Sequence, residues 1–308
     1  MSTSPLISVV MSVYNNEDFL PQAIKSIVSQ SYSNFEFIIV NDGSTDSSKH
    51  IIIEWQKTDD RIIFIDRKSN KGLPYSLNES IAIAKGKYVA RMDSDDVAIR
   101  DRFEKQVGFL EGKPEVDIVG GQVTHIDSKG SVLKSSKQPL SFEEIKLIAE
   151  FACPVNHPTY MVKKNAYVKL EGYRDVFIYA QDYDFILRAI DCNLIIENMP
   201  DILLQYRSST SERSTIKIHR QLYLGRQAIK LHKERVKFRL ESVKTFKKSK
   251  RTMFYAEILF SFSWNLRGKV LEMEIPRLAT YIFAFFLSLL HYEVFYDSLR
   301  GMRLKFRK

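Results

Sequence analysis

The stretch Tyr88-Val89-Ala90-Arg91-Met92-Asp93-Ser94-Asp95-Asp96 decides how the rest of the chain is interpreted. Residues 88–92 are a short, largely apolar run after Lys85-Gly86-Lys87, which indicates a helix end followed by a buried strand. Three carboxylates then come within four residues, where this strand should end. Such close like charges repel and lose hydration in a cleft, so a divalent cation is the natural partner. The alternative is a solvated acidic turn that caps a helix beginning near Arg100.

The residues before this stretch alternate between expected strands and expected helices. Strands are expected at residues 7–14, 35–40, 62–65 and 88–92, and helices after residues 15–16, after the turn at 41–46, and at 73–84. This alternation predicts an α/β fold with a doubly wound, mostly parallel sheet flanked by helices. Ligands bind beyond the carboxyl ends of strands in such sheets, and the turns at Asp42 and Asp93 should both lie there.

Composition limits the class of protein. With 308 residues, 44% of them hydrophobic, the chain can bury a core for one large domain or for one domain plus an appendage. Cys153 and Cys192 offer neither a disulfide framework nor metal-ligand spacing, which suits a reducing cytoplasm. The first residues lack the basic start and long apolar stretch of a signal peptide, so we expect no export.

The net charge of +9 is unevenly divided along the chain. Residues 1–206 carry 23 Lys+Arg against 29 Asp+Glu, a net of −6, whereas residues 207–308 carry 23 against 8, a net of +15. The first region is mildly acidic, as expected of a site that uses a metal ion, and the second requires an anionic partner or solvent.

Several short segments carry a family resemblance when they are taken together and in order. They are Val9–Asn15, Ile38–Asp46, Asp93–Asp96, Arg102–Gln106, Gly120-Gly121, Asn156-His157-Pro158 and Gln181–Asp184. This set resembles the successive motifs of the family 2 inverting glycosyltransferases with the GT-A fold, across roughly residues 5–207. In particular it resembles bacterial enzymes that build capsular, exopolysaccharide or O-antigen repeat units. The resemblance implies a nucleotide-sugar donor, with UDP as the expected nucleotide.

The resemblance also implies where the nucleotide binds. The matching positions are Ser12 and Tyr14 beside the base and Asp42 towards its edge. A carboxylate at a strand end can accept hydrogen bonds from an N–H or O–H of the nucleotide. Without the rest of the set, Tyr14 would be read as a core aromatic or a neighbour of a helix cap, and Asp42 as an Asx-turn residue.

Under this interpretation, the acidic turn binds the metal ion. Asp95 is expected to hold Mn²⁺ or Mg²⁺, with Asp93 on the ribose or on a coordinated water. The metal would neutralise the charge that grows on the diphosphate as the glycosidic bond breaks. Arg91 is expected to be a structural counter-ion of the acids, and the alternative is a phosphate contact.

An inverting transfer needs a general base for the acceptor hydroxyl, and Asp182 matches the family position. A helix is expected at residues 183–190, so Asp182 also fits the simpler role of an N-cap. Asp184 is a rival carboxylate, and Gln181 stands where relatives commonly have Glu.

Two further positions complete the expected site. His157 is expected to contact the acceptor or the donor sugar, and the alternative is a structural residue before a strand at 159–162. Arg207 is expected to neutralise phosphate. Relatives often have a histidine after this position, whereas Ser208 and Ser209 stand here. Residues 208–215 are either a mobile lid over the nucleotide or a linker.

The last hundred residues differ in kind. Residues 219–250 indicate basic amphipathic helices, and the apolar run at 278–290 is too short for a confident transmembrane helix. Peripheral association with the anionic inner face of the cell membrane is expected, with Arg300 to Lys308 as flanking cations. The alternative is a helical subdomain that packs on the catalytic part or on a second copy. Nucleic acid is not expected, because the aromatic residues do not interleave with the basic ones.

The sequence therefore predicts a catalytic domain at 1–215, with a nucleotide-sugar half at about 1–96 and an acceptor half at about 97–215. A basic, largely helical region follows at 216–308. The expected activity is inverting transfer of a hexose or N-acetylhexosamine to a glycan or lipid-linked acceptor. The transfer is expected to be non-processive, because the QxxRW pattern of processive synthases is absent. A catalytically degenerate binding or scaffold protein at the membrane is the alternative. A dinucleotide-dependent oxidoreductase is disfavoured because no GxGxxG follows the first strand.

Overall fold

The computed structural model describes residues 4–208 and 215–238. The chain divides into two compact units, and the larger one holds described residues 4–208 and 221–238. The first turn of the last described helix is assigned to the other unit. The domain boundary expected at 215/216 stays a prediction, and the apolar run at 278–290 lies outside the described residues. Within the described residues, no helix combines the length and the apolar character needed to cross a membrane.

Four parallel strands form the first half of the sheet. They are β1 (Ile7–Val13), β2 (Phe35–Asn41), β3 (Ile62–Asp66) and β4 (Tyr88–Asp93). Their order is β3-β2-β1-β4, with every neighbouring pair parallel. All four strands agree with the sequence prediction to within one residue at each end. The predicted α/β fold with a mostly parallel sheet on this side is confirmed.

The second half of the sheet mixes directions, which alternation of strands and helices did not predict. Its strands are β5 (Val97–Ala98), β6 (Val116–Ile126), β7 (Val132–Ser135), β8 (Met161–Lys163) and β9 (Ile195–Arg207). The order continues from β4 as β8-β6-β9-β5, with β7 beside β6. Strand β8 is antiparallel to both β4 and β6, whereas β6 and β9 are parallel. The strand expected at 159–162 begins two residues later, because the short helix η1 (His157–Thr159) precedes it.

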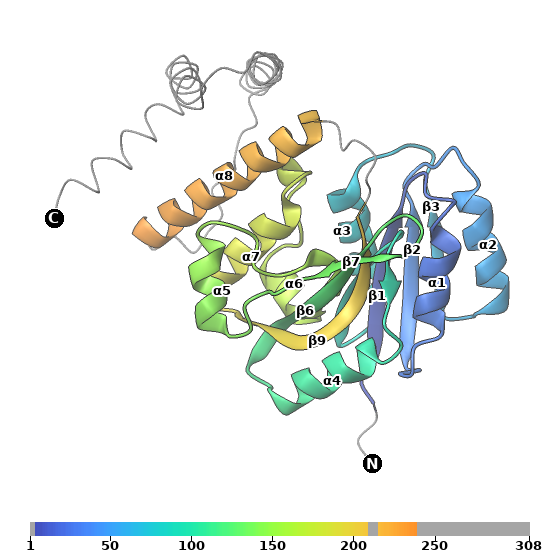
Figure 1. The fold of residues 1–308 in the computed structure, drawn as a ribbon, viewed down its shortest axis with the longest axis horizontal. Helices are drawn as coiled ribbons and strands as arrows, with labels where there is room; N and C mark the ends of the chain where they lie inside the picture. Colours follow the sequence, from blue (N-terminus) through green and yellow to red (C-terminus); the bar gives the residue numbers. More distant parts are fainter. Residues whose placement is uncertain (1–3, 209–214, 239–308) are drawn as a thin grey trace. The chain divides into compact units, whose positions relative to one another are not determined.

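Helices cover both faces of this sheet (Figure 1). On one face lie α1 (Leu20–Val28), α2 (Ser48–Thr58) and α4 (Arg102–Gly112). On the other lie α3 (Leu73–Ile83), α5 (Phe142–Ala149), α6 (Lys164–Lys169) and α7 (Gln181–Asp191). Successive side chains of a strand point to opposite faces, so Val9 and Met11 pack under α1 while Val10 packs under α3. The short helix η2 (Asp175–Phe177) and helix α8 (Thr215–Phe238) complete the described elements.

Gly86 illustrates how tightly β4 enters the sheet. The sequence predicts a helix end at Lys85-Gly86-Lys87, but α3 ends at Ile83 and Gly86 lacks the positive φ of a glycine helix cap. Instead, its backbone N–H donates to the Ser8 hydroxyl at 2.8 Å. An added Cβ would lie 2.5 Å from the backbone N of Ser8, which flexible side-chain motion cannot relieve.

We therefore expect Gly86→Ala to lower the free energy of unfolding by about 1–3 kcal/mol, the typical cost of overpacking. Gly108 is the matched control, because it lies on the exposed side of α4 and a Cβ added there would have no atom within 4 Å. Gly108→Ala should be neutral or stabilise by up to about 1 kcal/mol through helix propensity. Urea denaturation of both variants measures the difference, and equal stability of the two would contradict the packing described for Gly86.

Candidate active site

The carboxyl ends of β1, β2 and β4 bring the predicted donor-site residues to one edge of the sheet. In the register of the parallel strands, Ser12 lies opposite Val40 on β2 and opposite Asp93 on β4. Tyr14 and Asp42 follow directly after the ends of β1 and β2. The sequence prediction that these turns share one edge is confirmed.

The loops after β1 and β2 fasten to each other. Asn15 adopts a positive φ of 48°, and its side-chain oxygen accepts a hydrogen bond from the Thr45 backbone at 2.8 Å. The backbone N–H of Asn16 donates to the Ser48 hydroxyl at 3.0 Å, while its side-chain amide donates to Ser94 at 2.7 Å. Two loops about 30 residues apart and the acidic turn are thus joined by side-chain hydrogen bonds.

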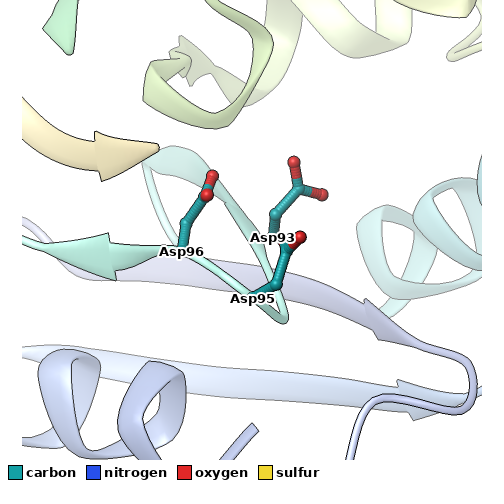
Figure 2. A group of neighbouring side chains, drawn as sticks. All are labelled: Asp93, Asp95 and Asp96. Atoms are coloured by element: carbon teal, nitrogen blue, oxygen red, sulfur yellow. The ribbon is translucent and has the colours of Figure 1, made fainter. Parts of the chain in front are cut away.

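The three acids of the turn between β4 and β5 form one cluster (Figure 2). A carboxylate oxygen from each of Asp93, Asp95 and Asp96 lies within 4.8 Å of the others. Asp93 and Asp95 are half-buried, whereas Asp96 is fully buried. Asp96 accepts one hydrogen bond from the backbone N–H of Arg207 at 2.7 Å, and its other oxygen is buried without a partner among the described residues.

The electrostatics of this cluster are those of an under-neutralised site. Burial, followed by repulsion from Asp93, raises the pKa of Asp95 to about 6. Burial and both neighbouring acids raise the pKa of Asp96 well above its usual range. Protein cations therefore do not fully balance the three carboxyl groups, and an additional positive charge at the cluster would favour their ionised forms.

Two arginines hold the turn in place. Arg91 is buried and binds both carboxylate oxygens of Asp93, so the predicted counter-ion role is confirmed. The Nε of Arg91 is itself buried without a partner among the described residues. The guanidinium of Arg207 donates to the backbone carbonyl of Asp95 at 2.8 Å and to the side chain of Gln22 at 2.9 Å.

Arg207 also reaches the turn after β6, where its guanidinium donates to the carbonyl oxygens of Asp127 and Ser128. Its guanidinium thus makes four hydrogen bonds inside the protein. In this arrangement Arg207 supports the acidic turn from the end of β9, and its predicted phosphate contact stays a prediction.

The cluster suits a divalent cation. Three carboxylates converge, one buried oxygen of Asp96 lacks a partner among the described residues, and all the available ligand atoms are hard oxygens of the kind that Mg²⁺ and Mn²⁺ prefer. Asp95 was the expected ligand. The sequence prediction placed Asp96 in the acidic cluster but gave it no separate role, and its buried position beside Asp93 and Asp95 makes it a second candidate ligand.

Asp182, the predicted base, lies in the first turn of α7. The helix begins at Gln181 with Ala180 as its N-cap, so the predicted start at residue 183 is two residues late and Asp182 is not the N-cap. Its carboxyl group is half-buried, and burial raises its pKa. The positive charge of Arg91 lowers this pKa and the charge of Asp93 raises it, which places Asp182 within electrostatic reach of the acidic turn.

Asp184, the rival carboxylate, has a different environment. It is fully buried and paired with two arginines, Arg174 and Arg188, whose Nε atoms each lie 2.9 Å from its Oδ2. Arg188 also donates to the carbonyl oxygens of Leu170 and Gly172, so the pair fastens α7 to the loop after α6. Enclosure of this kind leaves Asp184 with a structural role and leaves Asp182 as the accessible acid of the two.

The residues predicted to bind the nucleotide differ in their exposure and in how many protein groups contact them. Tyr14 is 50% exposed, which contradicts the core-aromatic alternative for this residue. Asp42 is buried, and its carboxylate accepts hydrogen bonds from Arg67, from the backbone of Lys71 and from the backbone of Gly72, each at 2.9 Å. The local side-chain hydrogen bond of this turn is made by Asn41 instead, whose amide oxygen accepts from the Ser44 backbone N–H. Only one of the three hydrogen bonds to Asp42 goes to its Oδ2, and a carboxylate oxygen can accept a second.

His157 is buried and its environment is structural. Its Nε2 lies 2.9 Å from the Tyr173 hydroxyl, and its ring packs edge-on against Tyr160 and Tyr173. Burial, followed by the charge of Arg91, lowers the pKa of His157 well below its usual range, so the ring is neutral at pH 7. The arrangement matches the structural alternative for this residue. Contact with a sugar stays a prediction.

Comparison with known proteins identifies the family of the chain. The model of the family described as "Glycosyl transferase family 2" matches residues 8–170. An uncharacterized glycosyltransferase of Methanocaldococcus jannaschii is 35% identical over 261 residues, covering 84% of this chain and 88% of that protein. The O-antigen biosynthesis glycosyltransferase WbnJ of Escherichia coli is 33% identical over 205 residues, covering 66% of this chain and 79% of that protein.

Solved structures share the fold at low sequence identity. The mannosyltransferase PcManGT from Pyrobaculum calidifontis, in complex with GDP-Man and Mn²⁺, superposes with a TM-score of 0.58 at 16% identity, covering 92% of this chain and 80% of that one. S. aureus TarS in complex with UDP superposes with a TM-score of 0.56 at 18% identity, covering 72% of this chain and 64% of that one, which is less than two thirds of its length. With a GT-A fold and a family model that matches more than half of its length, this chain belongs to the family 2 glycosyltransferases.

Proposed function

We propose that this protein is a metal-dependent, inverting glycosyltransferase that transfers one sugar per encounter from a UDP-sugar to a glycan or lipid-linked acceptor. The observation that carries the proposal is the convergence of three carboxylates within 4.8 Å, with Asp182 within electrostatic reach of them. A cation site and a carboxylate that can act as a base are what transfer from a nucleoside diphosphate to a hydroxyl group requires.

In the proposed reaction, Asp95 and Asp96 hold Mn²⁺ or Mg²⁺, and Asp93 orients the ribose or a coordinated water. The bound ion supplies positive charge for the diphosphate as it leaves. Arg91 keeps Asp93 in position through its two contacts with that carboxylate. Arg207 keeps the main chain of Asp95 and the side chain of Asp96 in position through one hydrogen bond to each.

Asp182 accepts the proton of the acceptor hydroxyl as the oxygen attacks the anomeric carbon. The new bond joins this oxygen to the anomeric carbon, the bond from that carbon to the phosphate oxygen breaks, and the electron pair leaves with UDP. Attack from the face opposite the leaving group inverts the anomeric configuration. A raised pKa makes Asp182 a stronger base than an ordinary carboxylate, provided that it is ionised at the working pH.

The nucleotide is proposed to lie along the ends of β1 and β2. The exposed ring of Tyr14 offers a surface for the base, Ser12 lies beside it, and the remaining lone pair of Asp42 can accept the uracil N–H. The solved structure of TarS with UDP supports a uridine nucleotide, whereas that of PcManGT holds GDP-Man, which makes guanosine the alternative. The transferred sugar is proposed to be a hexose or an N-acetylhexosamine.

The acceptor is proposed to be a growing surface polysaccharide at the cytoplasmic face of the cell membrane. The name of WbnJ, an O-antigen biosynthesis enzyme, supports this class of product. His157 is proposed to support the acceptor side of the site through its buried ring contacts with Tyr160 and Tyr173.

Two neighbouring acids on α7 allow a matched test of the base. We expect Asp182→Asn to lower the transfer rate by roughly 10²- to 10⁴-fold, the usual contribution of a general base, with little change in stability. Asp184→Asn should instead lower the free energy of unfolding by about 3–5 kcal/mol, because it leaves the buried Arg188 and the half-buried Arg174 without their counter-ion. Transfer assays and urea denaturation on both variants separate the two roles. Near-normal turnover in folded Asp182→Asn would refute the assignment of the base.

A panel of UDP-, GDP- and TDP-sugars, assayed with Mn²⁺ for release of the nucleotide, tests the proposed donor. UDP-sugars should be turned over, and Tyr14→Ala should raise the KM for the preferred donor more than it lowers kcat, because its ring is proposed to bind the base. Lys85→Ala is the control, since this exposed side chain lies at the amino end of β4. Turnover of GDP-sugars alone would contradict the uridine assignment.

A further inference from the structure

Helix α8 uses one side to pack on the catalytic unit. Leu224 and Ala228 are buried in a cluster with Ala149 of α5 and with Ala180, Tyr183 and Leu187 around α7. His232 and Arg235 point to the same side and bind the carboxylate of Asp191, the last residue of α7. Apolar contacts and a buried ion pair therefore fix this face of α8 against the helix that carries Asp182 (Figure 1).

The opposite side of α8 remains exposed and carries a different set of residues. They are Leu222, Arg226, Lys230, Lys233 and Val236, which we call the outer face of α8. At about 100° per residue these five positions fall within about 120° of the helix circumference, so they form one continuous stripe. Leu222 and Val236 are 55% and 62% exposed.

The three cations of the outer face have no ion-pair partner among the described residues. In this they differ from Arg235 of the same helix, which forms a buried ion pair with Asp191. Glu234, the only acid in the helix sequence, is half-buried at the edge of the stripe. The outer face therefore presents three positive charges, unpaired within the described part of the chain, between two exposed apolar side chains.

We propose that the outer face of α8 is the surface with which this protein binds an anionic lipid membrane. A stripe of cations attracts anionic headgroups, and exposed aliphatic side chains at its ends can enter the boundary with the acyl chains. Binding through this face would bring the unit that carries Asp182 to a surface that can hold a lipid-linked acceptor. This role of the membrane contact rests on the proposed function.

Other partners fit the outer face less well. A second copy of the same face would bring like charges together, which opposes a symmetric dimer through it. Single-stranded nucleic acid would need aromatic side chains between the cations, and the outer face has none. The net charge of +15 over residues 207–308 agrees in sign with an anionic lipid partner.

The test is sedimentation of the full chain with vesicles of phosphatidylcholine and phosphatidylglycerol, in the absence of donor and acceptor. The variant Arg226→Gln/Lys230→Gln/Lys233→Gln should lose roughly 100-fold in its partition coefficient, about fivefold for each cation removed. Binding of the unaltered chain should fall as salt is added and should be weak on vesicles of phosphatidylcholine alone. Nucleotide release in the absence of vesicles should be unchanged in this variant.

The matched control is Lys25→Gln/Lys85→Gln/Arg100→Gln, which removes the same number and kinds of exposed cations from other elements. It should retain vesicle binding to within a few fold. The proposal is overturned if the outer-face variant binds as tightly as the unaltered chain, or if both variants lose binding equally. It is also overturned if the outer-face variant changes the oligomeric state measured by light scattering, which would make the face a contact between copies. Because binding is measured without turnover, an inactive enzyme that still binds vesicles would refute only the proposed function.

Discussion

The structure depends on keeping three carboxylates together at the end of one buried strand. Asp93, Asp95 and Asp96 would repel one another and the low-dielectric interior would oppose their ionisation, as the raised pKa values of Asp95 and Asp96 indicate. The fold meets this cost with Arg91 on one side and Arg207 on the other. Neither arginine completes the neutralisation, since one oxygen of Asp96 and the Nε of Arg91 remain buried without described partners. A site that is held by hydrogen bonds but incompletely neutralised is suited to a bound cation.

The rest of the fold positions groups around this turn. The loops after β1 and β2 are joined to each other, and Asn16 joins them to Ser94 within the acidic turn. On the other side, α7 carries Asp182 at its start and is fixed by the buried pair of Asp184 with two arginines. Helix α8 is then fastened to the far end of α7 through Asp191. One helix thus connects the proposed catalytic acid to the exposed basic face.

The sequence predicted well what depends on local pattern. The four parallel strands follow from apolar runs and turn residues, and the acidic turn follows from three acids after a strand. It could not predict what depends on distant partners. Arg207 lies 111 residues from Asp96 along the chain, so its role as a support of the acidic turn has no local signal. Asp182 and Asp184 both lie in the first turn of α7, and the contacts of Asp184 with Arg174 and Arg188 are what distinguish the two acids. The mixed half of the sheet is likewise joined to the parallel half through β8, a strand of three residues that is antiparallel to both of its neighbours.

The most direct test of the proposed metal site is a crystal of the protein soaked with UDP and Mn²⁺, with anomalous diffraction recorded to locate manganese. We predict one strong anomalous peak within coordination distance of the Asp95 carboxylate and of the diphosphate oxygens, with Asp96 as a ligand or hydrogen bonded to one. The peak should disappear in Asp95→Asn. Bound UDP with no manganese at the acidic turn, and with the Asp95 carboxylate turned towards solvent, would contradict the central claim.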